Sequence, residues 1–76
     1  MPRFFFDIDD GYVIRDRVGR ELDDVTAARH EASKVASGLV GEEMTDGDGL
    51  TLVLSVRCED GSIALRIRMV CQVELT

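Results

Sequence analysis

A chain of 76 residues with 15 acidic and nine basic side chains carries a formal net charge of −6, and 45% of its residues are hydrophobic. This composition argues against a disordered chain and against sequence-independent binding to nucleic acid, which needs basic side chains to neutralise phosphates. The sequence also lacks the apolar run of roughly 18 residues that spans a membrane, so we expect one cytoplasmic domain over residues 1–76.

The first part of the chain predicts a β-hairpin. Residues 3–9 form the first expected strand, because every second side chain is apolar. The loop Asp9–Gly11 joins it to a return strand over residues 12–17. This register places Ile8 opposite Tyr12, and a brief extended segment then leads towards a helix.

Residues 24–42 are expected to form that helix, with Asp23 or Asp24 capping its first turn. Apolar residues recur along it at intervals of three and four, which is the signature of a helix with one buried face. These residues are Val25, Ala28, Ala32, Val35 and Leu39. A loop rich in glycine and aspartate follows over residues 45–49.

Two further strands, residues 50–58 and 62–71, predict a second hairpin whose apolar side chains share one face. A two-residue type I′ turn at Asp60–Gly61 would place Cys58 opposite Ile63. A slip of one residue would divide the apolar set between the two faces, so the hydrophobic pattern favours this register.

The same register separates the two cysteines. It pairs Val56 with Leu65 and Leu50 with Cys71, which leaves Cys58 at the other end of the hairpin. The two thiols would lie roughly 25 Å apart, whereas a disulfide needs Cα atoms within about 7 Å. We expect two buried free thiols, which suit a reducing compartment.

Together these elements predict an α+β two-layer fold of order ββαββ, in which a four-stranded antiparallel sheet packs on one helix. A core of this size rarely contributes more than about 3–5 kcal/mol to stability. Self-association, for example as a homodimer, is therefore expected.

Three patterns hint at chemistry, and each lacks a required partner. The strand ending in Asp7-Ile8-Asp9 resembles the first motif of haloacid-dehalogenase-type phosphatases. Those enzymes also need an acidic pair and a lysine on later strands of a doubly wound sheet, which a chain of 76 residues with one lysine, in the middle of the expected helix, cannot supply. Asp46 and Asp48 resemble part of a calcium loop without its closing glutamate, and His30 has no second ligand or catalytic partner. We expect no enzymatic activity, catalytic residue, metal, cofactor or small-molecule substrate.

The most distinctive candidate site is a group of arginines on the outward face of the second hairpin. Its residues are Arg57, Arg66, Arg68 and Val53. Opposite residues in the predicted register are Arg57 and Ala64, Arg66 and Ser55, and Arg68 and Val53.

Three interpretations of these arginines stay open. They could pair with acids of a neighbouring strand, such as Asp7 or Asp9, and keep the open face solvated. Guanidinium groups beside an exposed valine also suit a protein interface, where arginine is enriched. Finally, rigidly held guanidinium groups can bind phosphates in a bidentate manner, which would suit nucleic acid.

Four sequence segments resemble a family of small bacterial proteins of unknown function. They are Met1-Pro2-Arg3-Phe4-Phe5-Phe6, Ile14-Arg15-Asp16, Gly19-Arg20-Glu21-Leu22 and Ala27-Ala28-Arg29-His30-Glu31-Ala32. In the family these run as an MPR-aromatic-FF start, D-x-x-G-x-E-L and A-A-R-x-E-A, and a hairpin with an acid-glycine turn follows. A looser similarity is to the antitoxin half of HicAB-type toxin–antitoxin pairs, which implies a toxin-binding core without enzymatic activity.

These observations lead us to expect a non-enzymatic interaction module. It would bind a protein partner or a second copy of itself through the face that carries the arginines, or through an exposed strand edge. The alternative is a nucleic-acid-binding or HicB-like toxin-neutralising domain that uses the same arginines. No membrane partner is expected.

Overall fold

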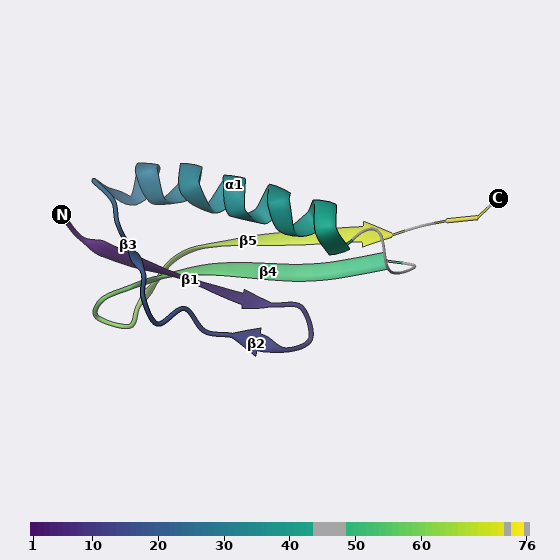
Figure 1. Ribbon diagram of the computed structural model, residues 1–76, viewed down its shortest axis with the longest axis horizontal. Coiled ribbons are helices and arrows are strands. Elements are labelled where there is room, and N and C mark those ends of the chain that lie inside the picture. Colours follow the sequence, from purple (N-terminus) through teal and green to yellow (C-terminus); the bar gives the residue numbers. More distant parts are fainter. Residues whose placement is uncertain (44–48, 73, 76) are drawn as a thin grey trace.

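The computed structural model describes residues 1–43, 49–72 and 74–75. In chain order its elements are β1 (Arg3–Asp9), β2 (Val13–Ile14), β3 (Arg20–Glu21), α1 (Val25–Glu43), β4 (Gly49–Cys58) and β5 (Ile63–Gln72). The helix lies along one face of an antiparallel sheet (Figure 1). The α+β class is thus confirmed, but the order ββαββ with four strands is incomplete, because the described residues form a fifth, short strand before the helix.

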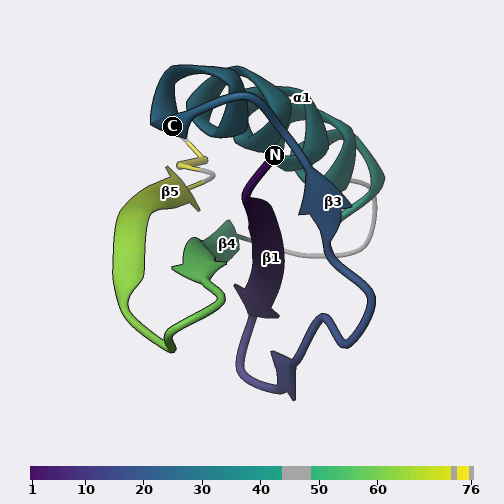
Figure 2. The same ribbon diagram turned by 90° about the vertical axis from the view of Figure 1, so that its left-hand side faces the viewer.

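The strands follow the order β2-β1-β4-β5, and β3 also pairs with β1. All of these pairings are antiparallel. Figure 2 shows β1 with β4 and β5 on one side and the two short strands on the other. The segment before the helix therefore pairs with one side of β1 in two separate pieces, β2 and β3. β5 lies at the opposite edge of the sheet.

The first hairpin is shorter than predicted and has a different register. The structure pairs Ile8 with Ile14, so the expected pairing of Ile8 with Tyr12 is wrong. Gly11 adopts a positive φ of 110°, and the amide of Asp10 donates to the Tyr12 carbonyl oxygen at 3.3 Å. Residues 10–12 thus form the turn, which removes Tyr12 from the strand.

The return strand also stops early, at Ile14 instead of residue 17. After an irregular stretch, the predicted extended segment pairs with β1 as β3, where Glu21 lies opposite Arg3 and Arg20 lies opposite Phe4. The sequence pattern correctly indicated extended backbone here, but not that this backbone joins the sheet.

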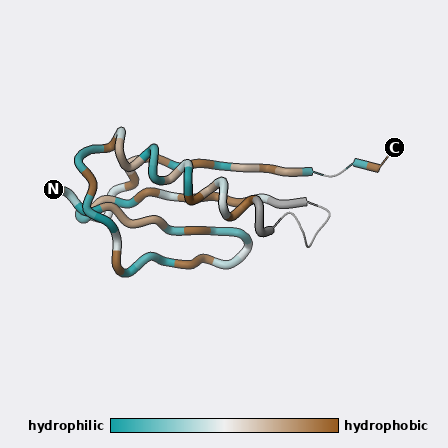
Figure 3. The backbone as a smooth tube through the Cα atoms, turned by 45° about the horizontal axis from the view of Figure 1, so that its top comes forward, coloured by the Kyte–Doolittle hydropathy of each residue, from teal (hydrophilic) through white to brown (hydrophobic). Residues whose placement is uncertain are grey.

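The second hairpin has the predicted register over most of its length. Leu50 pairs with Cys71 and Val56 with Leu65, and the pairs of Ser55 with Arg66 and Val53 with Arg68 are also present. In Figure 3 hydrophilic positions interrupt the mainly hydrophobic tube of these strands.

The register near the turn differs from the prediction. The Cys58 amide donates to the Ser62 carbonyl oxygen at 2.8 Å, and the Gly61 amide donates to the Cys58 carbonyl oxygen at 3.0 Å. Together with a φ of 91° at Gly61, these bonds define a three-residue loop, not a two-residue type I′ turn.

A register shift between Val56 and Arg57 reconciles this loop with the rest of the hairpin. As a result Arg57 lies opposite Ile63, and the predicted pair with Ala64 is wrong. Because opposite residues share a face, Ile63 lies on the face of Arg57 instead of the apolar face, and it is exposed.

The hydrophobic core lies between the helix and the sheet. Its buried residues are Phe4, Phe6, Ala28, Ala32, Ala36, Leu52, Leu54 and Val56. The three alanines recur every four residues along one side of α1, so the helix presents a surface of small side chains to the large residues of the strands. Close packing follows, since alanine keeps the helix backbone near the sheet.

Asp24 begins the helix as one of the two expected caps. Its Oδ1 accepts the Ala27 amide at 2.8 Å, and its carbonyl oxygen accepts the Ala28 amide at 3.0 Å. The predicted loop over residues 45–49 lies mostly outside the described residues, and Gly49 already belongs to β4.

Both cysteines are free, as predicted. Their thiols are half-buried, which corrects the expectation that both are fully buried. Cys58 packs against the core and Cys71 pairs with Leu50 at the far end of the hairpin. No helix among the described residues has the length and hydrophobicity needed to cross a membrane.

Candidate functional site

The sheet has one face away from α1, and the strand register places the predicted site residues on it. We call this the outer face and define it by Asp7, Asp9, Val53, Ser55, Arg57, Arg66, Arg68 and Val70. Side chains alternate between the two faces of a strand. The residues next to these along the strands therefore point to the other face, where nearly all of them lie in the core or pack against it. The structure thus brings Val53 and the three arginines together on one surface.

Arg57 is held by contacts within the chain. Its Nε donates to Oδ2 of Asp7 at 2.9 Å, and its guanidinium carbon lies 4.5 Å from the centre of the Phe5 ring. Only 14% of the Arg57 side chain is exposed, and the same fraction of the Asp7 side chain. The pairing of Arg57 with Asp7 on the neighbouring strand is therefore a structural contact, and a role for Arg57 in binding a partner stays a prediction.

The pKa of Asp7 lies below its ordinary value of 3.8. Burial alone raises this pKa, but the hydrogen bond from Arg57, the hydrogen bond from the Asp16 amide and the positive charges of Arg57 and Arg15 together outweigh burial. Asp7 is consequently ionised at neutral pH, and its charge is already matched inside the molecule.

Arg66 and Arg68 differ from Arg57, because both are exposed and lie on the edge strand β5. Among the described residues, no carboxylate forms an ion pair with either of them. Their cross-strand neighbours on β4 are the uncharged residues Ser55 and Val53. Val70, one position further along the same face, is 66% exposed.

A second feature lies at the other edge of the sheet, where Asp16 organises the irregular stretch between β2 and β3. Its carboxylate accepts three backbone amides, from Phe6 at 3.1 Å, Val18 at 3.0 Å and Gly19 at 3.1 Å. Burial raises the pKa of Asp16, but these three amides and the charge of Arg20 outweigh it and lower the pKa below 3.8. The ionised carboxylate thus replaces the strand pairing that this stretch lacks.

Arg57 and Asp7 extend this arrangement into the sheet. The Asp16 amide donates to Oδ1 of Asp7 at 2.9 Å, and Nη2 of Arg57 donates to the Asp16 carbonyl oxygen at 2.9 Å. We call these contacts the Asp7–Arg57–Asp16 network. It joins β1, β4 and the irregular stretch, so one residue of the predicted site braces a segment that lies far away in the sequence.

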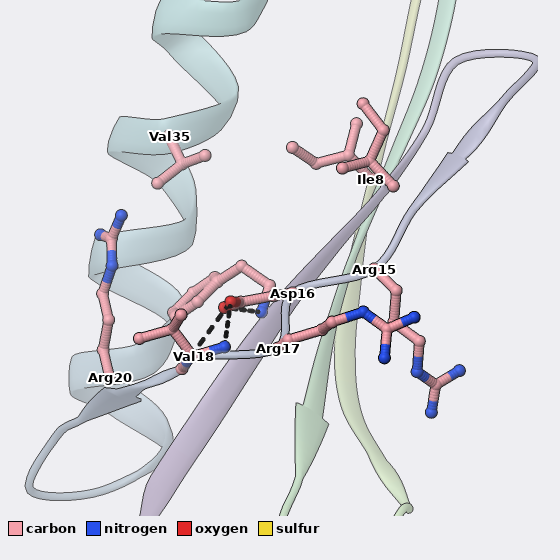
Figure 4. Close-up of a pocket in the computed structure, with 10 residues that line it drawn as sticks. Ile8, Arg15, Asp16, Arg17, Val18, Arg20 and Val35 are labelled. Carbon is pink, nitrogen blue, oxygen red and sulfur yellow. Dashed lines mark hydrogen bonds between the residues drawn. The ribbon is translucent and has the colours of Figure 1, made fainter.

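This braced stretch forms one wall of an open groove of about 490 Å³ beside α1 (Figure 4). The lining residues are Phe6, Ile8, Ile14, Arg15, Asp16, Arg17, Val18, Gly19, Arg20 and Val35. Arg20 stacks 5.3 Å from the centre of the Phe6 ring and pairs with Glu31. Figure 4 shows Arg20 beside the helix, whereas Arg15 and Arg17 project away from it.

The groove arginines therefore do not converge on a common point, and the walls are shallow, since Val18 is 75% exposed. Sequence analysis did not find this groove, because a continuous strand over residues 12–17 would have spread the same side chains over two faces. The signal that could have revealed it is Asp16 followed by Gly19, a pattern that suits a loop closed on its own amides better than a strand.

The other patterns considered from the sequence have structural explanations where they are described. Oδ1 of Asp9 accepts the Gly11 amide at 3.0 Å in the turn, and His30 is exposed on the helix. Asp46 and Asp48 lie outside the described residues. Within the described part of the chain, no three His, Cys, Asp or Glu side chains gather in a way that could hold a metal ion.

Comparison with known proteins places the domain in a family. The family model of a domain of unknown function, DUF6894, matches residues 3–70. The chain belongs to the DUF6894 family. The matched range includes the helix, β1 to β4 and nearly all of β5, so both the outer face and the groove lie within the DUF6894 domain. No curated protein and no solved structure matches the chain.

Proposed function

We propose that this DUF6894 domain is a non-enzymatic interaction module that binds a protein, either a partner or a second copy of itself, through the outer face. Arg66, Arg68, Val53 and Val70 form the contact, and Arg57 supports it from within the sheet. The observation that carries the proposal is that Arg66 and Arg68 are exposed side by side in a chain of net charge −6, without an ion-pair partner among the described residues.

The chemistry of this surface supports a protein partner. Arginine is enriched in protein interfaces, where it combines an apolar stem with several hydrogen-bond donors. Val70 adds apolar area, and the strands hold all of these side chains on a rigid surface. Free cysteines at both ends of the hairpin further support a location in the reducing cytoplasm.

The proposal can be tested by photo-crosslinking in the native host. A photoreactive amino acid replaces Val70 on the outer face, and the matched control carries it in place of His30 on the exposed side of α1. We expect a defined crosslinked protein from position 70 and none from position 30. A crosslink to the chain itself would identify self-association, whereas crosslinks from position 30 alone would overturn the proposal.

Salt dependence separates a protein partner from the rival, nucleic acid. The protein identified by crosslinking, once purified, should bind the wild-type domain with an affinity that depends on ionic strength less steeply than phosphate binding does, and more weakly when Arg66 and Arg68 are both replaced by alanine. A labelled single-stranded oligonucleotide serves as the comparison probe. If the oligonucleotide binds and its affinity falls steeply with salt, the arginines contact phosphates and the protein-binding proposal is wrong. If the crosslinked protein is a toxin encoded by a neighbouring gene, the interaction is the toxin-neutralising one.

A further inference from the structure

The two edges of the sheet are built differently. At the β1 edge the pairing is divided between β2 and β3, two residues each, with the Asp16-organised stretch between them. At the other edge β5 runs over ten residues and pairs with β4 alone among the described strands. An edge strand of this length presents a row of backbone donors and acceptors that another strand can use.

The two faces of β5 carry different chemistry along this edge. Arg66 and Arg68 lie on the outer face, whereas Leu65, Ile67 and Met69 are half-buried against the core. A strand added beside β5 would therefore meet guanidinium groups on one face and partly covered apolar side chains on the other. Because side chains alternate along a strand, its residues would need to alternate between acidic and apolar.

The fold already contains one strand of this kind. In β1, Asp7 lies on the outer face, whereas Phe6 and Ile8 pack into or against the core. β1 pairs with β4, where Phe5 lies opposite Arg57 and Asp7 lies opposite Ser55. Asp7 reaches the diagonal Arg57 on the same face at 2.9 Å. The chain itself thus shows how an acidic and apolar strand is accommodated beside an arginine-bearing one.

A second copy of β5 would bring arginines opposite each other in the registers centred near the middle of the strand. In a symmetric antiparallel pair, a register centred on Ile67 places Arg66 opposite Arg68 of the other copy twice. Registers centred on Arg66 or on Arg68 place that arginine opposite itself. Like charges directly opposite each other destabilise a strand pair, so charge disfavours these three registers of a β5 pair, whereas an acidic strand meets the arginines favourably in each of them.

We propose that β5 binds an extended segment of a partner protein, in which acidic and apolar residues alternate, as an additional strand of the sheet. The acidic side chains lie opposite Arg66 and Arg68, and the apolar ones cover the flank of Ile67 and Met69. Main-chain hydrogen bonds supply affinity and the alternating side chains supply specificity. This inference rests on the proposed function and specifies the partner and its mode of binding.

The test uses the full chain and a capped, fluorescein-labelled peptide of alternating glutamate and valine. Binding is followed by fluorescence anisotropy, and amide hydrogen exchange reports where the peptide binds. We expect saturable binding together with slower exchange of β5 amides. The double variant R66E/R68E should lower the affinity at least about tenfold, since two attractive pairs become repulsive.

Three controls make the result specific. A peptide of alternating lysine and valine should bind R66E/R68E better than the wild-type chain, which would be a reversal of charge preference. The variant R29E/K34E makes the same charge change on the exposed side of α1 and should leave binding of the glutamate peptide nearly unchanged. The glutamate peptide with methylated backbone nitrogens keeps its charges but cannot donate main-chain hydrogen bonds to β5, and it should bind much more weakly than the parent peptide.

The outcomes also separate this inference from the proposed function. If the methylated peptide binds as well as the parent peptide, or if β5 exchange is unchanged, strand addition is wrong. If the glutamate peptide does not bind while position 70 still crosslinks a protein whose binding depends on Arg66 and Arg68, the outer face binds a partner in another way. If neither experiment succeeds, both proposals are wrong.

Discussion

Arg57 and Asp7 are 50 residues apart in the chain, and their side chains meet on the outer face with Nε 2.9 Å from Oδ2. A second donor, Nη2, lies 3.4 Å from Oδ1 of the same carboxylate and 2.9 Å from the Asp16 carbonyl oxygen. Both side chains are largely shielded from solvent. This pair therefore holds two central strands and the irregular stretch in one arrangement, which makes it a stability element next to the proposed contact surface.

Removing the Asp7 carboxylate should destabilise the domain. We expect Asp7→Ala to lower the free energy of unfolding by about 1.5–3 kcal/mol, because the Arg57 guanidinium and the Asp16 amide both lose a charged acceptor. Chemical denaturation measures the change. Arg57→Ala should also destabilise the domain, and the double variant should cost less than the sum of the single ones. Arg66→Ala is the matched control and should change stability little, so an equal effect of Arg57→Ala and Arg66→Ala would contradict this role.

Stability should fall in acid through Asp7 and Asp16. The folded-state pKa of each lies below the ordinary value of 3.8, so the folded state releases these protons more readily than the unfolded chain. Their stabilisation is complete above the unfolded pKa and is lost as the pH falls through the folded values. Denaturation curves should therefore show a loss of stability below about pH 4. Asp7→Asn should reduce that loss, and an unchanged acid dependence in this variant would rule out the contribution of Asp7.

Much of the fold was predictable because its signals are periodic. The alternation along residues 50–71 specifies which face is buried, and the spacing of Ala28, Ala32 and Ala36 specifies the helix face. The errors lie where single polar contacts override periodicity. Asp16 closes a loop on backbone amides and ends β2 early, and the three-residue loop at Gly61 moves Arg57 by one position.

The candidate site was predictable to a similar degree. Alternation alone placed Arg66 and Arg68 on the outward face, in the register that the structure shows. It could not show that Arg57 differs from them, because the partners of Arg57 come from residues about 40 and 50 positions earlier in the chain. Such contacts depend on how strands are ordered in the sheet, and no local pattern contains that information.

The motif residues that carried the family resemblance have structural tasks around β3. Asp16 accepts backbone amides, and Gly19 lies against β1. Glu21 forms an ion pair with Arg3 at 3.4 Å. The Leu22 amide donates to the Pro2 carbonyl oxygen at 3.1 Å. The segment thus attaches the chain before the helix to the start of β1. Its residues are explained by the fold, so they do not by themselves indicate a catalytic or binding role.

The alanine face of α1 should tolerate no larger residue. Ala32 is fully buried against the sheet, so Ala32→Leu should lower the free energy of unfolding by about 1–3 kcal/mol through overpacking. Lys34→Leu adds a leucine on the exposed side of the same helix and should have little effect. Thermal denaturation of both variants measures the difference. Similar melting temperatures for the two variants would show that the helix can move away from the sheet without loss of stability.

Gly19 is required by its backbone conformation and by its surroundings. Its φ is +73°, and an added Cβ would lie 2.9 Å from both Arg3 Cγ and Phe5 Cε1 and 3.0 Å from the Phe4 carbonyl oxygen. We expect Gly19→Ala to lower the free energy of unfolding by about 2 kcal/mol or more.

Gly38 provides the matched control for Gly19. It lies within α1, and an added Cβ meets nothing within 4 Å. Gly38→Ala should therefore raise stability by about 0.5–1 kcal/mol, because alanine loses less backbone entropy in a helix. Urea denaturation of the two variants gives opposite signs if the Asp16-organised stretch is held as tightly as its contacts indicate. A Gly19→Ala variant as stable as the wild type would mean that this stretch moves away from β1 freely, and the groove would then lose its fixed wall.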